Sequence, residues 1–146
     1  MTASSSAEEN KALVRRYYEV FQEEDFDVLD EVLASDYTLH GIPGAEEELT
    51  GRDAVEEYLR DLLQAFPDMT STFEELVAED DTVAYRASMT GTHEGEFMGI
   101  PATGETVTIE GTGFFRIEDG KIAEAWPQMD TFGMMQQLGV ADLPDS

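Results

Sequence analysis

The stretch Glu105–Asp130, ETVTIEGTGFFRIEDGKIAEAWPQMD, decides the fold. Apolar and polar residues alternate through its two parts, 105–117 and 121–130, as they do in strands with one buried face. Between them stands Glu118-Asp119-Gly120, and Asp-Gly favours the positive φ angles of a two-residue hairpin turn. The stretch therefore predicts an antiparallel hairpin.

The rest of the chain extends this hairpin into an α+β fold. Alternating residues predict further strands over 70–78 and 82–93, and a short strand over 37–40. Apolar residues at helical spacing predict helices over 6–23, 25–34, 52–66 and 131–138. Helices first and strands later predict helices packed on one face of a mostly antiparallel sheet. Gly111 and Gly113 indicate a bend in it, and a bent sheet covered by helices encloses a pocket.

Composition limits the classes of function. The 146 residues suit a single domain, 1–146, with a flexible lead at 1–5 and a tail at 140–146. There are 33 acidic and 8 basic residues, which gives a net charge of −25. Acid spread over the whole chain indicates a halophilic protein from a salt-rich cytoplasm, and the alternative is an ordinary acidic protein. Nucleic acid is excluded as a partner because binding phosphates needs a cationic surface.

Other classes of function are excluded by what the chain lacks. There is no cysteine, so neither disulfide nor thiolate chemistry is expected. No apolar run approaches the roughly 20 residues that cross a membrane, and no secretion signal precedes residue 6. We therefore expect a cytoplasmic protein with no membrane partner.

Asp130 is the leading candidate for chemistry. On the strand predicted over 121–130, Trp126, Gln128 and Asp130 share one face with Ile122 and Glu124. If that face lines the pocket, Asp130 lies among apolar walls, which suits a carboxyl for proton exchange with a carbon acid. The alternative is that Asp130 caps the helix at 131–138.

The two histidines and one arginine are further candidates. His93 shares an apolar strand face with Tyr85, where it either contacts a ligand or is a core residue. His40 ends the short strand before a Gly-Ile-Pro-Gly loop, so it is placed for a pocket mouth. Arg86 falls on the opposite face from Tyr85, where it either binds substrate or pairs with surface acid. No third residue stands at a spacing that makes the histidines a metal site.

Taken together, these motifs resemble the SnoaL-like polyketide cyclases of the NTF2-like superfamily over roughly residues 8–140. The resemblance is carried by Asn10 with Tyr17 and Tyr18, Phe26–Leu33, His40, Gly51–Ala54, Ala65–Asp68, Gly91–His93, Gly99–Gly104, Asp119–Ile122, Trp126 with Asp130, and Gln137–Gly139. With the acidic composition, it suggests a haloarchaeal member of the family.

The resemblance implies a cone-shaped barrel in which three N-terminal helices pack on a strongly curved sheet. It also implies a homodimer formed through the open sheet, no metal and no organic cofactor. In the family a pocket aspartate is the acid and base for intramolecular aldol closure of a polyketide ester, and Asp130 matches it. His40, His93 and Trp126 match pocket positions, and Tyr18, Gln128 and Arg86 complete the candidate set of substrate-binding residues.

Two hypotheses follow from the sequence. The first is a cofactor-free cyclase or isomerase acting on a hydrophobic, carbonyl-bearing small molecule, with Asp130 and His93 as catalytic residues. The second is a non-catalytic module that binds a small molecule or dimerises. A related hydrolase is a further alternative. A buried Asp130 near a histidine favours the enzyme, whereas an apolar cavity with Asp130 turned outward as a helix cap favours the binding module.

Overall fold

The computed structural model describes residues 6–42 and 47–140. The expected lead at 1–5, most of the expected tail and part of the loop around Gly44 lie outside these residues. The elements along the chain are α1 (Ala7–Glu23), α2 (Asp27–Val32), β1 (Leu33–Leu39), β2 (Leu49–Thr50), α3 (Arg52–Ala65), β3 (Thr70–Glu79), β4 (Thr82–Thr92), β5 (Thr106–Glu118), β6 (Lys121–Met129) and α4 (Thr131–Leu138).

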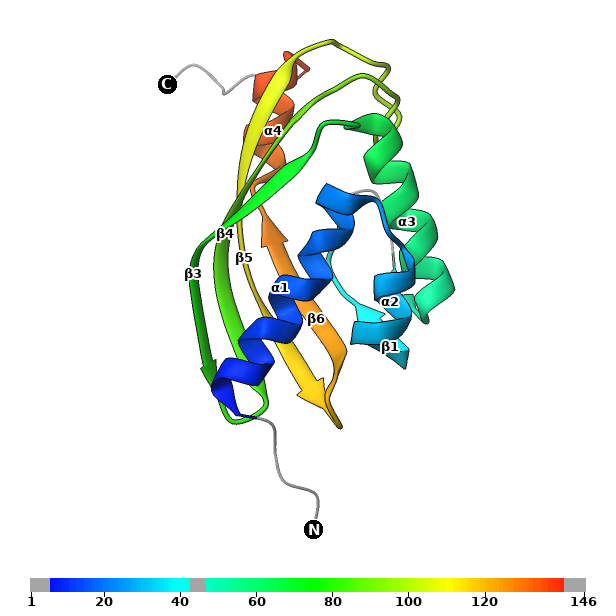
Figure 1. Ribbon diagram of the computed structural model, residues 1–146. Coiled ribbons are helices and arrows are strands. Elements are labelled where there is room, and N and C mark those ends of the chain that lie inside the picture. The colour runs from blue at the N-terminus through cyan, green and yellow to red at the C-terminus, as the bar shows by residue number, and fades with distance from the viewer. Residues whose placement is uncertain (1–5, 43–46, 141–146) are drawn as a thin grey trace.

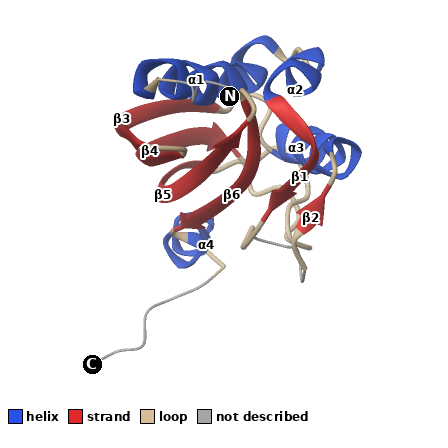
Figure 2. Ribbon diagram, turned by 90° about the horizontal axis from the view of Figure 1, so that it is seen from below, coloured by secondary structure: helices blue, strands red, loops and turns tan. Residues whose placement is uncertain are grey.

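The strands form one six-stranded sheet in the order β2-β1-β6-β5-β4-β3. Every neighbouring pair is antiparallel except β1 and β6, which are parallel. The sheet is strongly curved, and α1, α2 and α3 lie on its concave side (Figure 1). Seen from below, α1 and α2 lie side by side over the strands, with α4 at the far end of β6 (Figure 2). The predicted α+β fold with a curved sheet is confirmed.

The helices begin where local chemistry favours it. Ser6 accepts a hydrogen bond from the Glu9 backbone N–H at 3.1 Å, and Glu9 accepts one from the Ser6 N–H, which completes a capping box at the start of α1. The inward face of α1 carries Val14, Tyr17 and Val20, all buried. None of the helices in the described part of the chain has the length and apolar character to cross a membrane.

The two tight β-hairpins, β3–β4 and β5–β6, match the strands predicted from the sequence closely. Asp119 and Gly120 both have positive φ, 51° and 76°, which is the geometry that Asp-Gly favours between two strands. β4 pairs with β5 without interruption from Thr82↔Arg116 to Thr92↔Thr106. These long, continuous pairings hold the curved face under α1.

The region around residue 33 differs from the prediction. The helix expected over 25–34 ends at Val32, and the strand expected over 37–40 already begins at Leu33. The physical reason is tertiary, because Leu33 pairs with Ile122 of β6 and is fully buried there. The two-residue strand β2 carries no sequence pattern, since it consists only of the pairing of Leu49 and Thr50 with β1.

A bulge in β6 reverses the predicted orientation of its second half. Arg116 of β5 pairs with Glu124 and Ile117 with Ile122, so Ala123 is an extra residue opposite the β5 ladder. Ile122 faces inward, but after the bulge Ala125, Pro127 and Met129 are the residues that face inward. The prediction that Trp126 and Gln128 share the inner face with Ile122 is therefore wrong.

The C-terminal helix completes the sheet where β6 stops. Beyond Gly111↔Met129 no strand among the described residues pairs with that edge of β5. There Gln137 of α4 donates from Nε2 to the Thr108 carbonyl and accepts from the Thr108 N–H, both at 2.8 Å. The side-chain amide thus replaces a neighbouring strand.

Replacing Gln137 with Ala should lower the free energy of unfolding by about 1–2 kcal/mol, because two hydrogen bonds to the sheet are lost. Urea titration measures this change. The matched control is Gln136→Ala on the same helix, for which we expect a change within about 0.5 kcal/mol. Equal effects of the two substitutions would show that the amide does not support the sheet.

Candidate active site

An apolar cavity lies between the concave face of the sheet and helices α1 and α3. Its volume is about 90 Å³. Four methionines from different parts of the chain contribute to its lining, namely Met69, Met89, Met129 and Met134. Unbranched thioether side chains adapt readily to a ligand, so this wall can change shape.

The polar groups of the lining are almost all phenols. Five tyrosines line the cavity, and Thr90 supplies a hydroxyl; among the described residues no carboxyl, imidazole, amide or basic side chain lines it. The tyrosines are Tyr17 and Tyr18 of α1, Tyr37 of β1, Tyr58 of α3 and Tyr85 of β4. The site therefore offers hydrogen bonds from neutral groups within an otherwise apolar space.

Four of these tyrosines form one aromatic cluster. The ring centroids of Tyr17 and Tyr37 are 6.2 Å apart, and those of Tyr18 and Tyr85 are 6.3 Å apart. Phe115 of β5 contacts Tyr17, Tyr18 and Tyr85. Edge-to-face contacts of this kind fix the rings and so fix the positions of the hydroxyl groups.

Burial keeps these phenols protonated. It raises the pKa of Tyr17, Tyr18, Tyr37 and Tyr85 above the ordinary value, because a phenolate loses its hydration there. Burial also raises the pKa of Tyr58, to about 12. At neutral pH all five hydroxyls are thus available as donors.

Gly113 makes room for one of them. A Cβ at Gly113 would lie 2.8 Å from the Tyr85 hydroxyl oxygen and 2.7 Å from the Trp126 carbonyl oxygen. Gly113 of β5 pairs directly with Tyr85 of β4. The sequence suggested that Gly113 marks a bend, and the structure shows that its missing side chain admits the Tyr85 ring.

Asp130 lies outside the cavity lining. Its side chain is exposed, and its Oδ1 accepts a hydrogen bond from the Gly133 N–H at 2.9 Å, so it is the N-cap of α4. The prediction that the carboxyl lies among apolar walls is wrong in this structure, and the alternative of a helix cap holds. The neighbouring Met129 and Met134 do line the cavity, so Asp130 stands beside its edge.

His93 is fully buried behind the cavity wall. Its ring stacks on Phe66, a lining residue, with centroids 5.3 Å apart. The Thr103 N–H donates to Nδ1 at 3.3 Å, and the Thr103 hydroxyl lies 3.1 Å from the same nitrogen. In the neutral ring the proton is therefore on Nε2, which has no hydrogen-bond partner among the described residues.

His40 and Trp126 belong to the outer face of the sheet. Their rings stack with centroids 5.3 Å apart and planes 6° apart. His40 Nε2 lies 2.7 Å from Glu124, whose other oxygen accepts from Arg116. The His40 hydrogen bond, and after it Arg116, lower the pKa of Glu124. None of His40, Trp126 and Gln128 lines the cavity. The bulge at Ala123 turns Trp126 and Gln128 of β6 outward, and His40, which follows β1, stacks on Trp126 there.

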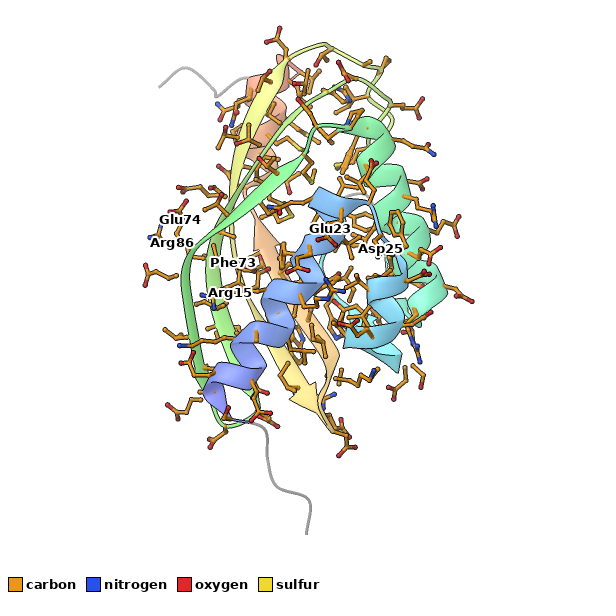
Figure 3. All side chains as sticks on the ribbon, viewed as in Figure 1. Arg15, Glu23, Asp25, Phe73, Glu74 and Arg86 are labelled. Atoms are coloured by element: carbon orange, nitrogen blue, oxygen red, sulfur yellow. The ribbon has the colours of Figure 1, made fainter. Side chains whose placement is uncertain are left out.

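Arg86 is also on the outer face, where it pairs with surface acid. Its Nε donates to Glu75 at 3.1 Å. Figure 3 shows Arg86 and Glu74 pointing away from the helices, while Phe73 points toward α1. Arg86 therefore does not line the cavity, and the alternative of an ion pair with surface acid holds.

Of the predicted site residues, Tyr18 alone lines the cavity. The sequence analysis missed the other four tyrosines as candidates. A signal was present, because Tyr17 and Tyr85 stand on apolar faces of a helix and a strand. In the described part of the chain, no group of three or more His, Asp or Glu side chains is arranged to hold a metal ion.

Comparison with known proteins agrees with this architecture. The family model of the SnoaL-like polyketide cyclases matches residues 11–138. The aklanonic acid methyl ester cyclases DauD of Streptomyces sp. (strain C5) and DnrD of Streptomyces peucetius are each 33% identical to this chain over 131 residues. These matches cover 87% of this chain, and 80% of DauD and 88% of DnrD.

Solved structures show the same fold. TsrD from Streptomyces laurentii superposes with a TM-score of 0.84 at 28% identity, over 94% of this chain and 99% of that one. IdmH from Streptomyces antibioticus superposes with a TM-score of 0.77 at 32% identity, over 90% of this chain and 99% of that one. An epoxide hydrolase of the LEH-like type from M. tuberculosis shares the fold alone, with a TM-score of 0.71 at 18% identity, over 90% of both chains. With the family model covering residues 11–138, this chain belongs to the SnoaL-like polyketide cyclase family.

Proposed function

We propose that the protein catalyses cofactor-free ring closure of a hydrophobic polyketide ester that carries carbonyl groups. The observation that carries this proposal is the apolar, methionine-walled cavity with phenol donors in a chain 33% identical to two aklanonic acid methyl ester cyclases. The apolar walls would hold the ring system, and the phenols would hydrogen-bond its oxygens without adding charge.

Asp130 is the proposed acid and base. A cavity of about 90 Å³ is smaller than the roughly 150 Å³ that encloses benzene, so a polycyclic ligand must extend beyond it. A ligand that passes Met129 and Met134 reaches the carboxylate at the start of α4. There the carboxylate would take a proton from carbon, the resulting enolate would attack a second carbonyl, and the proton would return to the alkoxide.

His93 is proposed as a second catalytic residue. Its Nε2 has no hydrogen-bond partner among the described residues, and its ring lies against the lining residue Phe66. A rearrangement of Phe66 on ligand binding would expose this donor to a carbonyl oxygen on which negative charge develops.

A specific observation favours a second function, ligand binding without turnover. No carboxyl lines the cavity among the described residues, and the Asp130 carboxylate already accepts the Gly133 N–H as a helix cap. In that case the protein would bind an apolar ligand in the cavity and release it without chemical change.

The substitution Asp130→Asn separates the two functions. Asparagine also caps helices well, so fold and ligand affinity should stay unchanged. Turnover of aklanonic acid methyl ester should fall about 100- to 10,000-fold, because the general base is lost. Product formation followed by chromatography, with thermal melting as the control for folding, measures both. Full turnover in the variant would show that Asp130 is only a helix cap.

We further propose that two copies associate through the outer face of the sheet. Val77, Ala84, Phe114 and Trp126 are paired in one row across β3, β4, β5 and β6. Phe114 is 52% exposed and Val77 59%. On either side of this row, Arg86 and Arg116 pair with glutamates, which locally neutralises an otherwise acidic surface. An exposed apolar row of this kind is typical of an interface between proteins.

Replacing Phe114 with Glu should convert a dimer into a monomer, because the dimer would then bury two additional carboxylates, one from each copy, in the apolar row. Light scattering after size exclusion measures the mass. The matched control is Phe132→Glu on α4, since Phe132 is 47% exposed but lies outside the row. A wild-type protein that is monomeric, or a Phe114→Glu variant that is still dimeric, would contradict the proposed interface.

The acidic surface suggests that the protein works in a salt-rich cytoplasm, as a haloarchaeal protein does. With a net charge of −25, self-repulsion acts over about 30 Å at 0.01 M salt but only about 3 Å at 1 M. The thermal unfolding midpoint should therefore rise as KCl is added over this range, which calorimetry measures. A midpoint that stays constant would argue for an ordinary acidic protein.

A further inference from the structure

All five tyrosines of the chain line the same cavity. They come from α1, β1, α3 and β4, which are far apart in the sequence. Phenylalanine would fill the same space without a polar atom, so apolar packing alone does not account for phenol groups at these positions. Their shared position indicates a role for the hydroxyl groups.

The hydroxyl group of Tyr37 carries the argument. Tyr37 is completely buried, and its hydroxyl oxygen has no hydrogen-bond partner among the described residues. The Tyr17 ring is a close neighbour, with its centroid 6.2 Å from that of Tyr37, and the Tyr17 phenol contributes to the raised pKa of Tyr37 after burial. By distance and angle, however, the Tyr37 hydroxyl completes no hydrogen bond with it or with any other described residue. A buried donor that makes no hydrogen bond destabilises the folded protein, unless a ligand supplies the missing acceptor.

We propose that the Tyr37 hydroxyl, with the Tyr17 phenol beside it, is a donor site. It donates a hydrogen bond to a carbonyl or enolic oxygen of a conjugated, otherwise apolar ligand. This deepens the proposed function and rests on the part of it that places a ligand in the cavity. The ring-closing step is a separate proposal, which the Asp130→Asn variant tests.

The chemistry of the lining selects this class of oxygen. Because burial keeps the phenols neutral, they donate hydrogen bonds without supplying a full positive charge. No basic side chain lines the cavity among the described residues, so a carboxylate or phosphate would be buried there unpaired. An oxygen whose charge is shared with a conjugated ring system avoids that cost and still accepts the hydrogen bond.

The floor of the cavity fits a flat ligand beside these donors. Gly111 and Gly113 are successive inward positions of β5, so the strand presents bare backbone there. Tyr85 occupies the space over Gly113, and Phe115 stacks on Tyr85 with centroids 5.1 Å apart. An aromatic ligand would extend this stack.

In the proposed ring closure the donor site would act as follows. The carboxylate of Asp130 takes a proton from the carbon next to a carbonyl group, the electron pair of the broken C–H bond forms a C=C bond, and the π pair of the carbonyl group moves onto its oxygen. That oxygen accepts the hydrogen bond of Tyr37 while its negative charge develops. Tyr37 stays protonated throughout.

Tyr37→Phe tests the site with two probes of similar shape, 2-naphthol and naphthalene. The variant should bind 2-naphthol about tenfold more weakly than wild type, because one hydrogen bond is lost. Its affinity for naphthalene should be unchanged, since the apolar walls are the same. Calorimetric titration measures both affinities.

Ser71→Ala is the matched control, because the Ser71 hydroxyl is also buried without a hydrogen-bond partner among the described residues but does not line the cavity. It should retain the affinity of the wild type for both probes. Urea titration adds a second measurement, because Tyr37→Phe should be at least as stable as wild type if the hydroxyl has no partner in the free protein.

Equal affinity of wild type and Tyr37→Phe for 2-naphthol would overturn the donor site. So would a parallel loss of naphthalene affinity, which indicates altered packing, or a wild type that binds neither probe. These results differ from a failure of the role proposed for Asp130, in which Asp130→Asn retains turnover while the binding of 2-naphthol still depends on Tyr37.

Discussion

The concave face of β4, β5 and β6 must be covered by other elements, and the rest of the structure depends on this constraint. Its inward residues, such as Val83, Ile109 and Phe115, are almost fully buried. Burial of apolar surface stabilises a fold by about 25 cal/mol per Å². Because the sheet is curved, α1 and α3 cover this face without filling it completely, and the space that is left is the cavity.

The sequence predicted the elements well because their signals are local. The Asp119-Gly120 turn, the capping box at Ser6 and the end of α4 at Gly139 are set by a few neighbouring residues. The orientation of the site was not predictable in the same way. One extra residue at Ala123 moves Trp126 from the expected inner face to the outer one, and this bulge depends on the pairing with β5.

The same reasoning explains which site residues were missed. Most residues predicted for the site are charged or ionisable, but a cavity with apolar walls excludes such groups unless they are paired. The groups that remain compatible with it are phenols, which are large, largely apolar and able to donate one hydrogen bond. The charged residues instead form the outer surface, where Arg86 and Arg116 pair with glutamates.

The account makes the cavity, and not the outer face with His40 and Trp126, the place where a ligand binds. The most direct measurement is a crystal structure of the protein soaked or co-crystallised with aklanonic acid methyl ester. The account predicts ring density between α1 and β5, with a ligand oxygen about 2.5–3.0 Å from the Tyr37 hydroxyl. A ligand bound on the outer face, or a cavity that stays closed around unchanged side chains, would contradict it.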